Sequence, residues 1–474
     1  NDKIGRSYRA ESISQFHKLL SIFKLYLNFL NFTKMTDTNT NIDEKIREIY
    51  VVLTVGGEGT RMYPLTLHCP KPLIDMCNYP IIKRICEIFM IQGCRKFIFA
   101  SKEYENSVRI KEVVGLEENL TGRMQSRDIE ISDLEFNYAP KYGDKGSADA
   151  TKFAAKFFNV NTDMIIVGGD QIMDINVENM LKFHYEKNAL MTIGLLKVDD
   201  VSQYGVAELN EKGRIVKFVE KPKTGETKSN LANIGVYILS PKIREIFEKE
   251  NIDVIKDFGK DLIPYLVNNN YEIYGFSHEY YWNDVGTPDR YLQTTVDILN
   301  GKLNNIKFNK NEERYDRIWI KEDTYNRIMS KIKNKEIGLQ KPLRIGKNCD
   351  IYENTIIENS VIGDSVIIQK SCKIANVVIG DFTIVEENCT LNKCIIGKYT
   401  TIGKNSRIDA DANEFVATKS RIPVIGDDAE IYPNSMVGPG KRVACIADSY
   451  KVLATGKFTT LGMDAKSVYF MEKE

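Results

Sequence analysis

The chain has little histidine, no net charge and no long uncharged apolar run. Lysine and arginine total 65 residues, and aspartate and glutamate also total 65. This balance argues against a nucleic-acid-binding protein that relies on bulk positive charge, although it leaves a local basic patch open. The four histidines, His17, His68, His184 and His278, are too few and too scattered for chemistry centred on histidine.

The nine cysteines include no CxxC pair and no spacing typical of a zinc framework. An odd number leaves at least one thiol unpaired. We therefore expect reduced thiols and a cytoplasmic protein.

The most apolar stretch near the start of the chain, Phe16–Phe32, is interrupted by Lys18 and Lys24. It does not reach the roughly 18 uncharged residues of a membrane-spanning helix, and no small-residue cleavage site follows it. Because a polar stretch follows Met35, we expect Met35 to be the natural start and residues 1–34 to be upstream read-through. An amphipathic helix on a membrane surface or a partner is the alternative.

Residues 54–72, here called the signature string, read TVGGEGTRMYPLTLHCPKP and carry the clearest chemical signal. The apolar run 49–53 ahead of them predicts a buried strand. A glycine turn at the end of a strand lets backbone N–H groups approach a phosphate, because no Cβ stands in the way. Arg61 and Lys71 would add the positive charge that holds a polyphosphate. The string therefore predicts a site for transfer from a nucleotide.

Apolar runs alternate with helical patterns from about residue 48 to residue 300. This alternation favours an α/β fold, a Rossmann-like, mostly parallel sheet with helices on both faces. Ligands on such sheets bind at the carboxyl ends of the strands. A plain dinucleotide-binding site is disfavoured, because GxGxxG is absent after the first strand. The predicted strands are 50–55, 96–100, 164–167, 190–197, 206–209, 215–218 and 235–239, and the predicted helices include 80–91, 148–158 and 179–187.

A different period governs the last third of the chain. Ile-Gly pairs recur every 17 residues, and their isoleucines are Ile345, Ile362, Ile379 and Ile396. Within each repeat, successive apolar positions are six, six and five residues apart. Such hexapeptide periodicity predicts a left-handed parallel β-helix, in which one aliphatic residue per face points inward. Residues 409–423 break the pattern and are expected to form a loop. Residues 301–340 are charged and lysine-rich, which predicts a helical connector.

Several strings together resemble one family. GGEGTRM, PLT and PKPL, in this order within residues 56–73, resemble the signature of the sugar-1-phosphate nucleotidyltransferases (NDP-sugar pyrophosphorylases). The later strings VGGD (167–170), YGV (204–206), FVEKP (218–222), NIGVY (233–237) and WNDVGTP (282–288) agree with that family in order. Hexapeptide C-termini are common in it. Within the family, residues 55–81 most resemble mannose-1-phosphate guanylyltransferases.

The resemblance implies a reaction in which a sugar 1-phosphate attacks the α-phosphorus of a nucleoside triphosphate and pyrophosphate leaves. Because the nucleophile is already an anion, catalysis would consist of positioning and neutralisation of phosphate charge. The closest match implies GTP and mannose 1-phosphate as substrates and GDP-mannose as product. The alternatives are a glucose-1-phosphate adenylyl-, uridylyl- or thymidylyltransferase of the same family, or a catalytically silent regulatory paralogue.

The resemblance also implies roles for individual residues. Arg61 and Lys71 would be catalytic, and Asp170 and Asp284 would hold Mg²⁺, a hard cation that prefers oxygen ligands. Nucleotide contacts are expected from Gly56, Gly57, Gly59, Thr60, Gly146 and Ser147. Sugar contacts are expected from Gly205, Glu220, Lys221, Asn233 and Gly235.

Departures from the family pattern leave the base and the sugar open. Ser147 stands where a threonine is usual, and Asp149 stands where guanylyltransferases often have glycine. The sequence Ala-Asp-Ala at 148–150 is similar to adenylyltransferases, whereas Pro-Lys-Pro-Leu at 70–73 is not their usual form. Ile234 also replaces a common alanine.

We therefore predict an N-terminal extension over residues 1–46 that is disordered or upstream read-through, a nucleotidyltransferase domain over 47–300, the connector over 301–340 and the β-helix over 341–474. Residues 341–474 contain no histidine, which argues against a second, acyltransferase activity with a histidine base. Because a β-helix ends in exposed coil edges, we expect this domain to form a homo-oligomer. Nucleic acid and membrane are not expected as partners.

Overall fold

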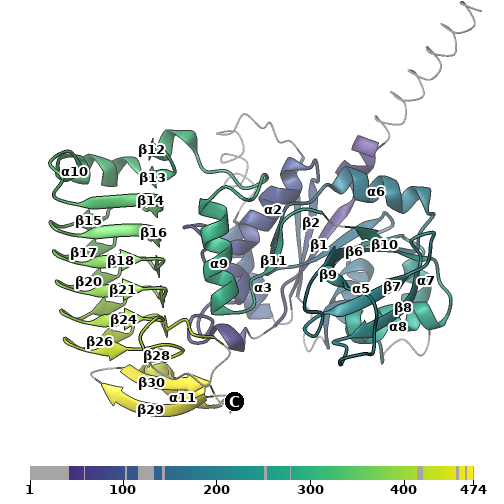
Figure 1. Ribbon diagram of the computed structural model, residues 1–474. Coiled ribbons are helices and arrows are strands. Elements are labelled where there is room, and N and C mark those ends of the chain that lie inside the picture. The colour runs from purple at the N-terminus through teal and green to yellow at the C-terminus, as the bar shows by residue number, and fades with distance from the viewer. Residues whose placement is uncertain are drawn as a thin grey trace, which may run out of the picture.

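Figure 1 shows the computed structural model of the chain, in which an α/β domain stands beside a stack of short strands. The structure describes residues 42–57, 59–101, 104–115, 133–140, 145–249, 254–277, 279–413, 420–454, 458–464 and 467–472. The predictions for residues 1–41 lie outside them. Residues 42–48 are helical, and Ile42 and Ile46 are buried in the core of the α/β domain. This domain therefore begins before residue 47, where its boundary was predicted.

The α/β domain is built on one sheet with the strand order β10-β6-β9-β4-β1-β2-β3. Neighbouring strands are parallel except at β9, which is antiparallel to both β4 and β6. The prediction of a mostly parallel sheet is therefore confirmed. The strands are β1 (Tyr50–Thr54), β2 (Lys96–Ser101), β3 (Glu135–Pro140), β4 (Met164–Gly168), β6 (Met191–Lys197), β9 (Leu231–Leu239) and β10 (Ile273–Ser277).

Helices cover both faces of this sheet because successive strand residues point to opposite sides. Val51 and Leu53 of β1 are buried with α2 (Ile81–Ile91), α3 (Tyr104–Val114), α6 (Val177–Glu186) and α9 (Pro288–Leu299). Val52 of β1 is buried on the other side, with α5 (Ser147–Phe157), α7 (Ile243–Phe247), η4 (Phe258–Leu262) and α8 (Ile263–Asn268). A strand buried on both faces reads as the continuous apolar run seen at residues 49–53.

Two antiparallel pairs stand at the edge of the sheet where the strands end. β7 (Gly205–Leu209) pairs with β8 (Ile215–Glu220) and also with β9. β5 (Gln171–Met173), which follows β4 directly, pairs with β11 (Trp282–Asp284). The second pairing joins two segments that are more than a hundred residues apart in the sequence.

The stack of short strands has the repeat that the sequence predicts. Ile345 aligns with Ile362, Ile379 and Ile396 in consecutive parallel pairs, so one turn of the stack takes 17 residues. After Ile396 the next partner is Ile425, so the spacing there is 29 residues and not 17. The strands of one face are β14 (Gly338–Ile345), β16 (Ile356–Ile362), β19 (Val378–Ile379), β22 (Ile395–Ile396), β25 (Val424–Ile425) and β28 (Arg442–Cys445).

The two other faces repeat in the same register. One is the sheet β15 (Asp350–Ile351), β17 (Ile367–Ile368), β20 (Ile384–Val385), β23 (Thr401–Ile402) and β26 (Glu430–Ile431). The other continues from β16 through β18 (Lys373–Ala375), β21 (Thr390–Asn392), β24 (Arg407–Asp409) and β27 (Met436–Val437). The aliphatic residues of all three faces share one buried cluster. This arrangement is a parallel β-helix.

The glycine of each Ile-Gly pair lies where one coil touches the next. A Cβ on Gly363 would lie 2.7 Å from the backbone nitrogen of Asp381 in the following coil. Stacking at this corner therefore requires glycine, which explains why the pair repeats as a unit.

The β-helix is bounded by elements that lack the hexapeptide period. The connector contains one helix, α10 (Glu322–Lys333), but also η5 (Lys310–Glu312) and the strands β12 (Glu313–Tyr315) and β13 (Ile318–Ile320). The prediction of a helical connector is thus only partly right, because β13 pairs with β14 and extends the first face of the stack. At the other end the hexapeptide pattern stops, and α11 (Ile446–Ala454), β29 (Phe458–Asp464) and β30 (Ser467–Glu472) follow.

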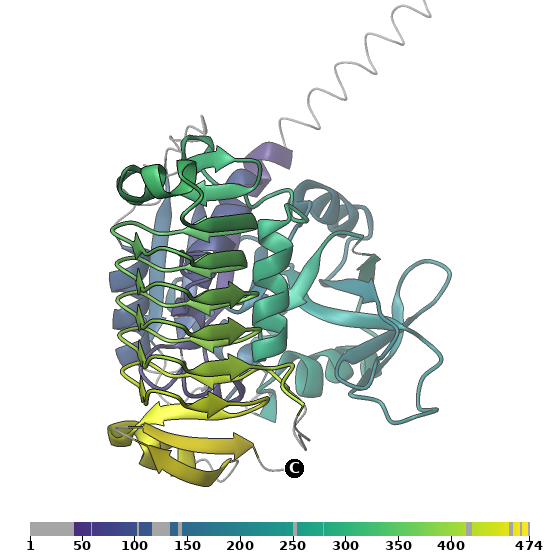
Figure 2. The same ribbon diagram turned by 60° about the vertical axis from the view of Figure 1, so that its left-hand side comes forward.

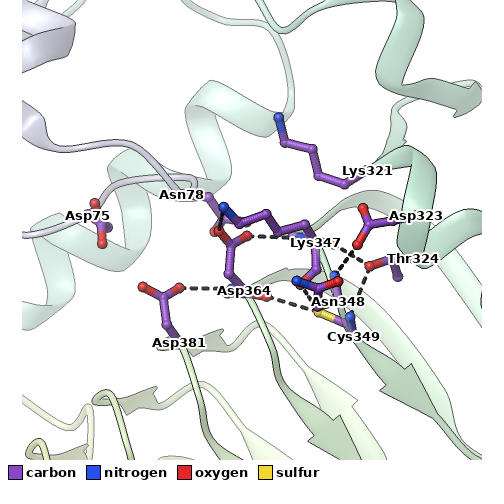
Figure 3. Close-up of polar contacts among 12 residues, drawn as sticks. Asp75, Asn78, Lys321, Asp323, Thr324, Lys347, Asn348, Cys349, Asp364 and Asp381 are labelled. Carbon is purple, nitrogen blue, oxygen red and sulfur yellow. Dashed lines mark hydrogen bonds and ion pairs between the residues drawn. The ribbon is translucent and has the colours of Figure 1, made fainter. Parts of the chain in front are cut away.

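The β-helix packs against the α/β domain along α9, as Figure 2 shows from a second side. Lys398 of the β-helix forms ion pairs with Asp75 of the α/β domain at 2.6 Å and with Asp381 at 3.0 Å. Asn78 Nδ2 donates to the carbonyl of Ile362 at 2.8 Å. Figure 3 shows Asp75 and Asn78 beside Asp364 and Asp381, which lie on successive coils of the β-helix. The segment just after the signature string is thus fastened to the β-helix.

Candidate active site

The predicted site residues gather at the ends of β1 and β4, on the edge of the sheet that carries β5, β7 and β11. A cavity of about 330 Å³ opens there. Among its lining residues are Arg61, Ser147, Gly205, Glu220, Lys221, Asn233, Gly235 and Asp284. The structure therefore brings together residues from six separate strings of the sequence.

A second cavity of about 340 Å³ adjoins the first and contains the glycine turn. Its lining includes Gly56, Gly57, Gly146 and Ser147, and it shares Thr54, Ser147 and Asp257 with the first cavity. Gly59 and Thr60 line neither cavity. Gly59 precedes the short helix η1 (Thr60–Met62), which carries Arg61, and its carbonyl accepts a hydrogen bond from Thr66 Oγ1 at 2.9 Å.

Gly146 directly precedes helix α5 and has a backbone conformation that only glycine adopts readily. Its φ is 150°, and a Cβ there would lie 2.6 Å from the carbonyl oxygen of Lys256. The backbone N–H groups of Ala148 and Asp149 donate to that same carbonyl, at 2.9 and 3.1 Å. The Ser147 hydroxyl donates to Asp257 Oδ2 at 3.1 Å. The start of α5 is therefore fixed by the segment just before η4.

The pairing of β5 with β11 places Asp170 and Asp284 at one point. Asp284 aligns with Gln171, and the N–H of Val285 donates to the carbonyl of Asp170 at 3.0 Å. Lys71, in the short helix η2 (Lys71–Leu73), forms an ion pair with the Asp170 carboxylate and lies 3.6 Å from Asp284 Oδ1. Lys71 is only 8% exposed. The predicted catalytic lysine and the two predicted metal ligands thus form one cluster.

The pKa of Asp284 is raised above its ordinary value. Burial is the largest cause, and the nearby Asp170 carboxylate adds to it, while Lys71, Arg290 and Arg61 act in the opposite direction. Two carboxylates held this close repel each other unless a cation lies between them. Arg61 lies next to this cluster, with its guanidinium against Gly286.

The carboxylate pair suits a divalent cation. In this structure the ammonium group of Lys71 stands between the two carboxylates, where a cation is electrostatically favoured. Within the described residues, no group of three or more His, Cys, Asp and Glu side chains is placed to hold a metal ion. Two carboxylates are nevertheless enough for Mg²⁺, which commonly takes one or two protein carboxylates and completes its coordination with water and substrate phosphates. The donor set therefore fits a phosphate-bound Mg²⁺.

The predicted sugar contacts lie in the first cavity, whose lining does not include the glycine turn. The pKa of the Glu220 carboxyl is raised, chiefly by burial, and this carboxyl lies beside Gly205. The backbone N–H of Lys221 donates to the carbonyl of Tyr204 at 2.9 Å. Asn233 Oδ1 accepts from the N–H of Gly235, at 2.9 Å. All five predicted sugar contacts line this cavity.

Other residues of the cavity were not predicted as site residues: Gln171, Tyr204, Asp257, Trp282 and Arg290. Gln171 directly follows Asp170, and Tyr204 and Trp282 belong to strings that had been recognised, so their positions were available. Asp257 belongs to no such string. Its place at the site follows only from the fold, which brings it to Ser147 across 110 positions of sequence.

A family model described as nucleotidyl transferase matches residues 50–301, and a second, described as GMPPB C-terminal domain, matches residues 339–443. A glucose-1-phosphate adenylyltransferase of Clostridioides difficile is 33% identical over 355 residues, covering 69% of this chain and 84% of that protein. The UTP–glucose-1-phosphate uridylyltransferase of a Synechocystis species is 28% identical over 339 residues, covering 66% and 82%. The beta catalytic subunit of mannose-1-phosphate guanylyltransferase from Danio rerio is 31% identical over 243 residues, covering 51% and 62%.

Proposed function

The chain belongs to the nucleotidyl transferase family, and from this premise we propose that it makes GDP-mannose and pyrophosphate from GTP and mannose 1-phosphate. The reaction class, nucleotidyl transfer to a sugar 1-phosphate, is that of the family. The choice of base and sugar and the roles of individual residues are the proposal.

The convergence of Lys71, Asp170 and Asp284 carries the proposal. These residues come from three separate strings, yet Lys71 forms ion pairs with both carboxylates, and Asp284 lines the first cavity. A catalytically silent paralogue would be expected to lack one of these charges. Their presence together with Arg61 supports an active enzyme.

In the proposed reaction a phosphate oxygen of the sugar 1-phosphate attacks the α-phosphorus of the nucleoside triphosphate. The bond from the α-phosphorus to the bridging oxygen breaks, and pyrophosphate leaves with the electron pair. No side-chain base is needed, because the attacking oxygen is already anionic. The protein's contribution is positioning and neutralisation of charge.

The glycine turn at Gly56 and Gly57 and the start of α5 at Gly146 and Ser147 would hold the nucleotide in the second cavity. Arg61 would bind the β- and γ-phosphates and the departing pyrophosphate. Lys71 would bind near the α-phosphate once a divalent cation, and no longer Lys71, neutralises Asp170 and Asp284. Gly59 and Thr60 would shape the turn that presents Arg61.

The family uses a divalent cation, and we propose Mg²⁺ held by Asp170 and Asp284. When bound, Mg²⁺ would withdraw charge from the phosphate oxygens and help to fix the triphosphate. On the sugar side, Glu220, Lys221 and Asn233, with the backbone of Gly205 and Gly235, would bind the sugar hydroxyls and the sugar phosphate.

The mannose assignment is supported by the match of residues 339–443 to the GMPPB C-terminal domain and by the mannose-1-phosphate guanylyltransferase relatives. A glucose-1-phosphate adenylyltransferase is the second candidate. It is supported by relatives that align over more of the chain and by the segment Ala-Asp-Ala at 148–150, which resembles adenylyltransferases.

We further propose the domain division at residues 300 and 341, a cytoplasmic location consistent with nine unpaired cysteines, and a homo-oligomer formed through the β-helix. No helix among the residues that the structure covers has the length and apolar character needed to cross a bilayer. Light scattering coupled to size exclusion tests the oligomer. A monomer at micromolar concentration would contradict it.

The experiment for the function is a substrate matrix. GTP, ATP, UTP and dTTP are each mixed with mannose 1-phosphate or glucose 1-phosphate and Mg²⁺, and pyrophosphate release is measured. We expect the highest rate for GTP with mannose 1-phosphate. A clear preference for ATP with glucose 1-phosphate would replace the mannose assignment. If no substrate pair released pyrophosphate, the proposed enzymatic activity would be refuted.

A further inference from the structure

Arg290 joins the carboxylate cluster to the sugar side of the cavity. It lies in the first turn of α9 and lines the same cavity as Lys221 and Asp284. Its Nη1 donates to Asp284 Oδ2 at 3.2 Å, and its Nη2 donates to the Tyr204 hydroxyl at 2.7 Å. One guanidinium thus bridges a predicted metal ligand and the loop that precedes β7.

An arginine at this position works against the helix that carries it. The first turn of a helix has a partial positive charge, so acidic residues are favoured there and cations are not. The preceding residue, Asp289, follows this rule, whereas Arg290 does not. Residues that break a local preference are concentrated at functional sites. The position therefore indicates a function beyond stabilising α9.

The bond from Arg290 to Asp284 is not one that a metal-loaded site would keep unchanged. A divalent cation at Asp284 would compete with the guanidinium for the same carboxylate. A guanidinium has five N–H donors, and its bonds to Asp284 and Tyr204 use two of them within the described residues. Donors of Arg290 are therefore available to a ligand in the cavity, and more become so when Asp284 is occupied.

The charge of the cavity indicates which ligand this is. The first cavity is lined by the carboxylates of Glu220, Asp257 and Asp284 and by the cations Arg61, Lys221 and Arg290. A sugar 1-phosphate brings a phosphate dianion into this cavity. Because Arg61 is assigned to the triphosphate, Lys221 and Arg290 remain to offset that charge. The lining of the nucleotide-side cavity does not include Arg290. A planar guanidinium is also the side chain best suited to bind phosphate through two parallel hydrogen bonds.

We propose that Arg290 binds the phosphate of the sugar 1-phosphate and sets its position for attack, while Tyr204 holds the arginine at the cavity wall. The inference rests on the proposed function of the site. It adds a substrate-binding residue on the acceptor side that the sequence strings did not indicate. Its effect should therefore fall on the sugar 1-phosphate and spare the nucleoside triphosphate.

The test compares R290Q and R290K with the control R214Q in steady-state kinetics. Arg214 is a good match, because its side chain is also 29% exposed and also faces a carboxylate, Glu272 at 3.5 Å, outside the cavity lining. R290Q should raise KM for the sugar 1-phosphate by about 10- to 100-fold, the range for losing a hydrogen bond to a charged group. KM for the nucleoside triphosphate should stay within about twofold, and R214Q should match the wild type.

R290K keeps the charge but not the fork, so we expect a smaller rise than in R290Q. This variant also provides the test if R290Q does not fold, which a thermal melt would reveal. An unchanged KM for the sugar 1-phosphate in folded R290Q would overturn the inference. So would an equal rise of both KM values, which would make Arg290 only a counter-ion of Asp284. A wild type that turns over no substrate pair would instead refute the proposed function itself.

Discussion

Replacing Lys71 by methionine should affect metal binding and catalysis in opposite directions. Methionine keeps most of the length and apolar surface of the side chain but removes the ammonium group that lies between Asp170 and Asp284. If Lys71 competes with a divalent cation for these carboxylates, K71M should bind the cation more tightly than the wild type. If Lys71 also neutralises the α-phosphate, K71M should have a lower kcat.

The structure sets the size of both effects. Two unit charges about 4 Å apart interact by about 1 kcal/mol in water and about 4 kcal/mol at a partly screened protein site. The Asp170 and Asp284 side chains are 33% and 27% exposed, so the lower half of that range applies. We expect about tenfold tighter binding of Mn²⁺, used as a probe for Mg²⁺, in free K71M. Loss of a cation that stabilises the transition state should reduce kcat by about 100-fold or more.

Mn²⁺ binding is measured by electron paramagnetic resonance, and kcat by pyrophosphate release. The matched control is K96M, because Lys96 also forms an ion pair with a carboxylate, that of Glu48. Lys96 is the first residue of β2, so it lies at the edge of the sheet opposite the site. K96M should leave both quantities unchanged. A Mn²⁺ affinity in K71M equal to that of the wild type, or lower, would refute the competition, and an unchanged kcat would refute the catalytic role.

Three further predictions concern stability. G146A should lower the free energy of unfolding by about 1–3 kcal/mol, because φ of Gly146 is 150° and the Lys256 carbonyl leaves no room for a Cβ. It should also raise KM for the nucleoside triphosphate. Thermal melts and kinetics measure the two effects, and a variant with unchanged stability and KM would contradict the prediction. I379A, which truncates a side chain that is 1% exposed in the β-helix core, should cost about 2–5 kcal/mol in urea unfolding, and a cost under 1 kcal/mol would speak against the assigned register. Burial lowers the pKa of His184 to about 4 from 6.5, so the unfolded chain takes up a proton at higher pH than the folded chain does. The contribution of neutral His184 to the free energy of unfolding is therefore fully present above pH 6.5 and falls by about 2 kcal/mol by pH 5. In H184Q, unfolding measured over the same pH range should show a smaller fall.

Local patterns were enough to predict most of the fold. The strand β1 and the coils of the β-helix follow from apolar runs and from the Ile-Gly repeat, since both depend on neighbours in the sequence. The short strands β5 and β11 were not predicted, because three residues carry no periodicity. β13 was missed for a related reason: it is a strand only because β14 is there to pair with it.

The candidate site divides in the same way. Arg61 and Lys71 could be recognised because they lie in one continuous string beside a glycine turn. The meeting of Asp170 with Asp284 depends on the pairing of β5 with β11, which no local pattern encodes. Arg290 was missed because its significance lies in the two partners that the fold brings to it, Asp284 and Tyr204.

The most direct test of the central claim is product analysis of the wild-type protein with GTP, mannose 1-phosphate and Mg²⁺. We predict that GDP-mannose and pyrophosphate appear in equal amounts, that neither forms when mannose 1-phosphate is omitted, and that K71M is strongly impaired. Pyrophosphate released from GTP alone at the same rate, or no GDP-sugar from any sugar 1-phosphate, would contradict it.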